Sequence, residues 1–129
     1  MKEFRVIIAG SRKYDDYDTL KKKCNHILSQ KLDDKDVRVI ILSGCATGAD
    51  TLGERYANEY GLSIERYPAD WSKYGRSAGP IRNEEMAAAA DALIAFPKEG
   101  EDNKGTWSMI SIARKKGLQI RIIGNEIIN

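Results

Sequence analysis

The sequence has few of the residues that build cross-linked or metal-held scaffolds. Its 129 residues include two cysteines, Cys24 and Cys45, and a single histidine, His26. Two cysteines in a chain of this size argue against a disulfide framework, and one histidine cannot build a His-based metal site. We therefore expect no metal ion and no metal cofactor. The scarcity of cysteine also predicts a cytoplasmic location.

Long hydrophobic runs are also missing. No apolar run approaches the ~20 residues that a membrane-spanning helix needs. The segment "MKEFRVIIAGSR" has too short an apolar run for a secretory signal and lacks a cleavage site. It predicts a first β-strand instead, and we expect no membrane partner.

The sequence also lacks a marked excess of either positive or negative charge. Lys and Arg number 21 against 19 Asp and Glu, a net charge of +2. Such a balance gives no broad electrostatic attraction for nucleic acid or for an anionic membrane. It argues against a nucleic-acid partner and leaves room for a local basic pocket.

What the chain does have is an alternation of apolar runs and helical patterns. The runs rich in β-branched residues predict five strands, at 4–10, 37–44, 62–68, 92–97 and 118–124. The alternation over 1–129, without an internal repeat or a linker, predicts one α/β domain built on an open, doubly wound sheet.

Four helices are predicted between these strands. One apolar stripe runs from Asp18 to Leu32. A second helix would be capped by Asp50 and stopped by Gly61. The third would start near Pro80, and the fourth would follow Thr106 and stop at Gly117.

Ligands of such sheets bind beyond the carboxyl ends of the strands, where the strand order reverses. The first segment expected there is "GSRKY". Gly10 permits a tight turn and close approach of backbone to ligand, and Ser11 and Arg12 offer a hydroxyl and a cation. The alternative is that Gly10 only turns the chain and Arg12 is solvated.

The second segment is "SGCATGAD", from Ser43 to Asp50. Gly44 and Gly48, spaced by small residues, allow backbone N–H groups to point at an anion, and the following helix adds its positive end. A tight strand-to-helix turn needs similar residues. No histidine lies nearby to activate Cys45 as a nucleophile, so we expect it to be a small packing residue.

The third segment is "PADWSKYGRSAGPIRNEEM". Arg82 and Asn83 lie in the first turn of the predicted helix, where the guanidinium suits a phosphate or carboxylate. Trp71 would either stack on a base or pack structurally. Asp70 would accept from ribose hydroxyls or form a salt bridge with Arg76.

The fourth segment is "PKEGEDNKGTW". Gly105 and Thr106, at a helix start, predict a further anion cradle. The preceding "KEGEDNK" is charged and broken by glycine, so a plain solvated loop is favoured over one that closes on a ligand.

Taken together, "GSR", "SGCATGAD", "PADWSKYGRSAGPIRNEEM" and "KGTWSMI" resemble the YspA-like branch of the SLOG superfamily, which is related to the Lonely Guy phosphoribohydrolases and to DprA. The similarity extends in order over essentially the whole chain. It implies a single Rossmann-like three-layer domain with a mostly parallel five-stranded sheet. It also implies a nucleotide-type ligand and, because relatives often pair, a homodimer.

The resemblance to Lonely Guy enzymes can be carried over residue by residue. Their Arg-Lys-x-x-Met run is matched by Arg82, Asn83 and Met86, and the GT of their PGGxGTxxE motif by Gly105 and Thr106. Arg82 thus holds the place of a catalytic arginine. The catalytic glutamate position is Met109, which has no proton to exchange. Substitute carboxylates would be Asp70, Glu84 or Glu85, although Glu85 is favoured as an ordinary ion-pair partner of Arg82.

Three functions follow as hypotheses. The leading one is a sensor or binding module for a nucleotide or its derivative, such as ADP-ribose, an NAD-like molecule or a nucleoside phosphate. The first alternative is a hydrolase or transferase acting on a nucleotide N-glycosidic bond. The second is a DprA-like binder of single-stranded nucleic acid, against which the balanced charge argues.

Overall fold

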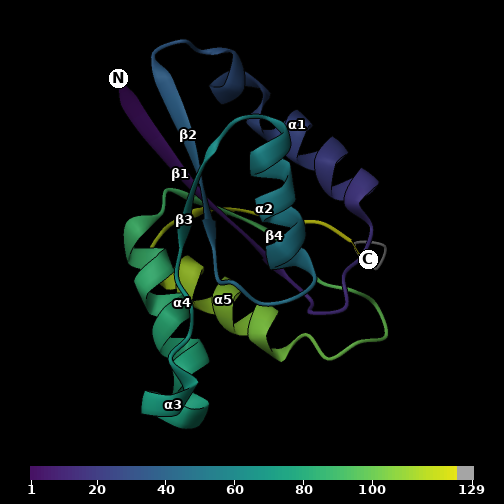
Figure 1. Ribbon diagram of the computed structural model, residues 1–129, viewed down its shortest axis with the longest axis vertical. Coiled ribbons are helices and arrows are strands. Elements are labelled where there is room, and N and C mark those ends of the chain that lie inside the picture. Colours follow the sequence, from purple (N-terminus) through teal and green to yellow (C-terminus); the bar gives the residue numbers. More distant parts are fainter. Residues whose placement is uncertain (125–129) are drawn as a thin grey trace.

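The fold is built on one five-stranded sheet, seen in a computed structural model that describes residues 1–124 (Figure 1). All neighbouring strands are parallel, in the order β3-β2-β1-β4-β5. The prediction of an α/β fold with a mostly parallel sheet is confirmed. The strands are β1 (Lys2–Gly10), β2 (Val37–Ser43), β3 (Ser63–Arg66), β4 (Ala92–Phe96) and β5 (Gln119–Ile122).

Two helices cover one face of the sheet. Helices α1 (Tyr17–Asp33) and α2 (Ala49–Glu59) pack Leu20, Cys24 and Tyr56 against one set of strand side chains. These three residues are completely buried. Because β1 and β2 are covered on both faces, their central residues are apolar in unbroken runs rather than in alternation.

The other two long helices cover the opposite face (Figure 1). Helices α4 (Ala78–Ala89) and α5 (Lys104–Lys115) pack Met86, Met109 and Ile110 against the second set of strand side chains. The result is a three-layer arrangement, helices–sheet–helices, with a core on each side of the sheet.

The ends of the helices correct several predictions. Helix α2 has Gly48, not Asp50, at its N-cap position. Helix α5 begins at Lys104, two residues before Thr106. Helix α4 begins at Ala78, near Pro80 as predicted, so Arg82 and Asn83 lie in its second turn rather than its first.

The segment before α4 is more ordered than a simple loop. A short helix, α3 (Trp71–Tyr74), is followed by a 3₁₀ turn, Gly75–Ser77. Both lie at one end of the molecule (Figure 1). The predicted glycine stops after α2 and α5 are confirmed, since Gly61 and Gly117 both have positive φ.

The strand order positions the site. The chain runs outward from β1 to β3 and then returns to place β4 on the other side of β1. The carboxyl ends of β1 and β4 therefore diverge into connections on opposite sides, with Gly10 beside Phe96. This is the switch point at which doubly wound sheets hold ligands. No helix of residues 1–124 has the length and hydropathy needed to span a membrane.

Candidate functional site

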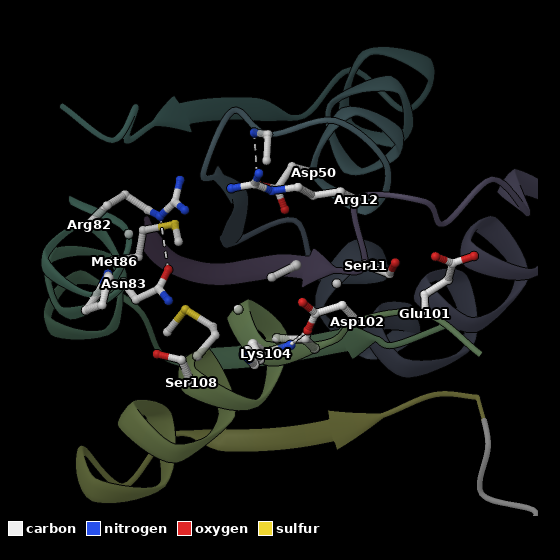
Figure 2. Close-up of a pocket in the computed structure, with 18 of the residues that line it drawn as sticks. Ser11, Arg12, Asp50, Arg82, Asn83, Met86, Glu101, Asp102, Lys104 and Ser108 are labelled. Atoms are coloured by element: carbon white, nitrogen blue, oxygen red, sulfur yellow. Dashed lines mark hydrogen bonds between the residues drawn. The ribbon is translucent and has the colours of Figure 1, made fainter. Parts of the chain in front are cut away.

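A cavity of about 560 Å³ lies at this switch point. Its walls come from the β1–α1 turn, the start of α2, the start of α4 and the start of α5 (Figure 2). Three helix starts therefore border one cavity. Those of α2 and α5 bring backbone N–H groups that lack intrahelical partners. At α4 the N–H of Ala78 donates to Gly75 of the preceding 3₁₀ turn, and Pro80 has no N–H. The lining side chains that carry the argument are Ser11, Arg12, Asp50, Trp71, Arg82, Asn83, Glu101, Asp102, Lys104 and Thr106.

The turn after β1 is fixed by its backbone. The N–H of Ser11 donates to the carbonyl of Phe96 at 3.0 Å, and the carbonyl of Ser11 accepts from the N–H of Ala49 at 3.1 Å. A Cβ on Gly10 would lie 2.2 Å from the carbonyl oxygen of Phe96. Gly10 thus allows β1, β4 and α2 to meet closely, and Arg12 extends from that junction into the cavity.

The β2–α2 loop depends on its two glycines. Gly48 has a φ of 75°, and a Cβ there would lie 2.3 Å from the carbonyl oxygen of Ser11. A Cβ on Gly44 would lie 2.7 Å from Nη1 of Arg82. Both positions bring backbone against another wall of the site, which explains why glycine occupies them.

Ser43 and Cys45 do not line the main cavity. The buried Ser43 hydroxyl donates to Glu54 at 2.6 Å and accepts from the N–H of Cys45 at 3.1 Å. It therefore links the β2–α2 loop to helix α2. Cys45 is exposed and has a φ of 66°. The expectation that it is a packing residue is wrong, because the loop turns its side chain outward.

Asp50 is a buried acid at the edge of the cavity, with 7% of its surface exposed. Its Oδ2 accepts a hydrogen bond from the N–H of Ala46 at 3.1 Å. Burial raises the pKa of the carboxyl to about 6, against the opposing effects of the Ala46 hydrogen bond and of the nearby Arg82 and Arg12 charges. This carboxyl therefore changes charge close to neutral pH.

Arg82 and Asn83 form the α4 wall. Nε of Arg82 donates to Oδ1 of Asn83 at 3.0 Å, and Nη1 donates to the carbonyl oxygen of Gly44. Within residues 1–124, Nη2 of Arg82 has no hydrogen-bond partner. No ion pair joins Arg82 to Glu85 in that part of the chain, so the expected helix pair is wrong: the guanidinium turns toward the cavity instead.

Trp71 lines the cavity from α3, with half of its surface exposed. The Arg12 guanidinium lies 5.9 Å from the centre of its ring.

Asp70 does not line the cavity. Its carboxylate accepts from Ser72 Oγ at 2.9 Å and from the N–H of Lys73 at 3.1 Å, which makes it the N-cap of α3. The predicted salt bridge to Arg76 is not formed among the described residues.

The wall contributed by α5 differs from the sequence prediction in one respect. Gly105 and Thr106 line the cavity as expected, and Thr106 is buried. However, Glu101 and Asp102 from the preceding loop also reach it, and Asp102 accepts from the N–H of Lys104 at 2.9 Å. The loop predicted to be plainly solvated therefore forms an acidic rim, and a carboxylate already satisfies one amide at the α5 N-terminus.

Met86 and Met109 supply an apolar part of the same wall, and both are buried. Met109, the position matched to a catalytic glutamate, therefore does face the site but offers only a thioether. None of the three proposed substitutes lines it: Asp70 caps α3, Glu84 pairs with Lys116 at 3.6 Å, and Glu85 is exposed on α4. The buried carboxylate of the cavity is Asp50.

A second hollow of about 300 Å³ adjoins the first. Arg12, Trp71 and Arg82 line both hollows, and Gly44 and Cys45 line only the second. The two arginines and the tryptophan thus stand between two compartments.

Most of the predicted residues meet at this place. Nine of them line the main cavity: Gly10, Ser11, Arg12, Asp50, Trp71, Arg82, Asn83, Gly105 and Thr106. Gly44 lines the second hollow, while Ser43, Gly48 and Asp70 support the surrounding loops. The rim acids and Lys104 were missed, because their charged segment resembles any solvated loop. In the described chain, no three His, Cys, Asp or Glu side chains cluster as metal ligands.

Comparison with known proteins identifies the family. Residues 4–74 match the family described as "YspA, cpYpsA-related SLOG family". The chain is also 31% identical over 128 residues to the Gene 61 protein of Mycobacterium phage D29, covering 95% of this chain and 98% of that protein. The chain belongs to this SLOG family, which confirms the resemblance drawn from its motifs.

Solved structures share the fold. DNA processing protein A (DprA) from Streptococcus pneumoniae superposes with a TM-score of 0.65 and 18% identity, over 99% of this chain and 52% of that one. The protein TM1055 gives a TM-score of 0.61 and 17% identity, over 93% of this chain and 72% of that one. The chain thus spans about half the length of the DprA chain, and at these identities the likeness shows the fold alone.

Proposed function

We propose that this SLOG-family protein binds a nucleotide or nucleotide derivative at the switch-point cavity, as a sensor or binding module. ADP-ribose, an NAD-like molecule or a nucleoside phosphate has the required chemistry. The observation that carries the proposal is that Arg12 and Arg82 project into one cavity bordered by the N-termini of α2, α4 and α5.

The two cations favour a phosphate-bearing ligand. Neither Arg12 nor Arg82 forms a salt bridge within residues 1–124, and the guanidinium of Arg12 makes no hydrogen bond there; only the backbone carbonyl of Arg12 is bonded, to Thr47 Oγ1 at 3.3 Å. A guanidinium without a carboxylate partner is available for bidentate contact with phosphate. The N-termini of α2 and α5 add partial positive charge, although the first amide of each is already bonded, to Ser11 and to Asp102 respectively.

The remainder of a nucleotide has partners on the adjoining walls. The half-exposed Trp71 ring offers a stacking surface for a base. The two compartments that share Arg12, Trp71 and Arg82 suit a ligand with phosphates in its middle and a group at each end.

A thermal-shift panel of AMP, ADP-ribose, NAD and cyclic nucleotides tests the proposal. A ligand present at about 100 times its dissociation constant adds ~2.7 kcal/mol of stability. We expect a rise in melting temperature with at least one phosphate-bearing ligand, reduced in Arg12→Ala and Arg82→Ala. No rise with any of them would contradict the proposal.

One observation supports an enzymatic alternative, hydrolysis or transfer at a nucleotide N-glycosidic bond. Asp50 provides a buried carboxylate in the cavity that also holds Arg82, and general acid–base assistance is typically worth ~10²–10⁴ in rate. Release of free base from a nucleoside monophosphate, lost in Arg82→Ala, would support it. Ligand binding without turnover over the same panel would reject it.

Single-stranded nucleic acid fits the cavity less well. Glu101 and Asp102 place negative charge at its rim, which repels a polyanionic backbone. Backbone binding also requires cationic surface and weakens with salt. A labelled oligonucleotide that shows no salt-sensitive binding would reject this alternative.

A further inference from the structure

Asp50 is the one Asp or Glu side chain of residues 1–124 that is buried. It lies in the first turn of α2 and borders the main cavity. An ionised carboxylate in such a place normally has an ion-pair partner, because burial without one is costly. Asp50 has no salt bridge to any described residue.

One carboxyl oxygen of Asp50 is free. Oδ2 accepts from the N–H of Ala46 at 3.1 Å, and no described residue bonds to Oδ1. Every fully enclosed side-chain N or O atom in the described chain has a hydrogen-bond partner, so Oδ1 is not fully enclosed, and the side chain that carries it lines the cavity. Figure 2 shows the Asp50 side chain beside that of Arg12, with its carboxyl directed into the cavity.

Charged groups approach Asp50 from three elements. Arg82 lies on α4, Arg12 on the turn after β1, and Glu54 one turn further along α2. The two cations favour ionisation of Asp50, while burial and Glu54 oppose it, and burial has the largest effect. The charge on Asp50 is therefore set by a balance that a ligand in the cavity would alter.

A phosphate placed between the two arginines would shift that balance. Its negative charge would repel an ionised carboxylate at Asp50 and offset the cations that favour ionisation. A protonated carboxyl would instead donate an O–H···O hydrogen bond to a phosphate oxygen. Met109 cannot do this, although it occupies the place matched to an acid.

We propose that Asp50 is the proton-binding group of the cavity, and that it takes up one proton from solvent when a phosphate group binds between Arg12 and Arg82. The proton moves onto Oδ1, and no covalent bond of the ligand changes. This inference rests on the proposed function, since it requires a phosphate-bearing ligand.

Isothermal titration calorimetry with ADP-ribose tests the coupling. Its pyrophosphate is esterified at both ends and has no ionisation near neutral pH, whereas a phosphate monoester has one near pH 6 that would obscure that of Asp50. Titrations at pH 7 in buffers of different ionisation enthalpy report the protons taken up. We expect close to one proton per ligand, and an affinity that falls up to about tenfold per pH unit between pH 6 and pH 8.

Two variants make the test specific. Asp50→Asn keeps the size and an acceptor for the N–H of Ala46 but cannot take up a proton. It should bind with no proton uptake, with little pH dependence, and more tightly than the wild type at pH 8. Glu59→Gln removes a carboxylate from the far end of the same helix, and it should bind ADP-ribose and take up protons as the wild type does.

The outcomes are distinguishable. ADP-ribose binding without proton uptake, or Asp50→Asn that is weaker at every pH, would overturn the coupling and leave nucleotide binding intact. Absence of ADP-ribose binding between pH 5 and pH 8 would overturn the coupling too, and the panel of other nucleotides would then decide the proposed function.

Discussion

The guanidinium of Arg82 donates a hydrogen bond to the carbonyl oxygen of Gly44, so a side chain from α4 holds the loop that follows β2. A second bond, to Asn83, fixes the plane of the same group. These two bonds leave Nη2 for a ligand. Arg82 therefore both shapes the cavity and supplies part of its positive charge.

Replacing Arg82 should therefore weaken ligand binding strongly. A hydrogen bond to a charged group is worth about 1.5–3 kcal/mol, so Arg82→Ala should lower the affinity for a phosphate-bearing ligand at least tenfold. Arg82→Lys keeps the charge without the planar fork and should give an intermediate affinity. Calorimetry on the three proteins measures this, and equal affinities would show that Arg82 has only a structural role.

Trp71 and Trp107 provide a matched pair on the surface. They are 50% and 49% exposed, but only Trp71 lines the cavity. Stacking on a base is worth about 1–3 kcal/mol, so Trp71→Ala should lower nucleotide affinity roughly five- to 150-fold. Trp107→Ala should leave the affinity unchanged. If both variants bind as the wild type does, the base does not stack on Trp71.

The glycines should separate into structural and tolerant positions. A Cβ on Gly10 would meet the backbone oxygen of Phe96 at 2.2 Å, whereas one on Gly105 would meet nothing within 4 Å. Overpacking typically costs about 1–3 kcal/mol or more, so Gly10→Ala should be clearly destabilised. Gly105→Ala should be as stable as the wild type or up to about 1 kcal/mol more stable, because alanine favours the helix.

Urea unfolding followed by circular dichroism measures both variants. A Gly10→Ala protein with an unchanged midpoint would mean that β1 and β4 can separate without cost. A destabilised Gly105→Ala protein would mean that the start of α5 needs a backbone conformation that alanine cannot adopt.

The fold and much of the site follow from short-range patterns. The Val- and Ile-rich runs at β1 and β2 predict buried parallel strands, and parallel strands bring their carboxyl ends to one edge. Arg12, Arg82 and the glycine turns could be expected to meet for that reason. The position of the cavity that these residues surround depends on the strand order, in which β1 lies between β2 and β4.

The errors have a different physical origin. Asp50 resembles a capping acid, but Gly48 occupies the cap position and the helix buries Asp50 in its first turn. The charged loop before α5 is held across the sheet edge by Lys98, whose Nζ donates to the carbonyl of Lys13 at 3.0 Å. Such long-range contacts leave no periodic signal. The Asp70 cap of α3, in contrast, could have been read from an acid preceding a short helical segment.

Asp50 should also make the stability of the unliganded protein depend on pH. Its pKa rises from an ordinary 3.8 to about 6 on folding, chiefly through burial. The folded protein therefore binds this proton more tightly than the unfolded chain does. The favourable contribution is fully present below pH 3.8 and is lost as the pH rises to 6, at most about 3 kcal/mol.

The Asp50→Asn variant should remove this loss. It should be more stable than the wild type above pH 6, by an amount that shrinks below pH 6 and vanishes near pH 4. Glu59→Gln should behave in the opposite way, because Lys21 and Tyr17 lower the pKa of Glu59 and its charge stabilises the fold at neutral pH. Urea unfolding of the three proteins from pH 4 to pH 8 measures both effects. If Asp50→Asn is less stable than the wild type at pH 7, the ionised carboxylate stabilises the folded protein, and burial does not determine its charge.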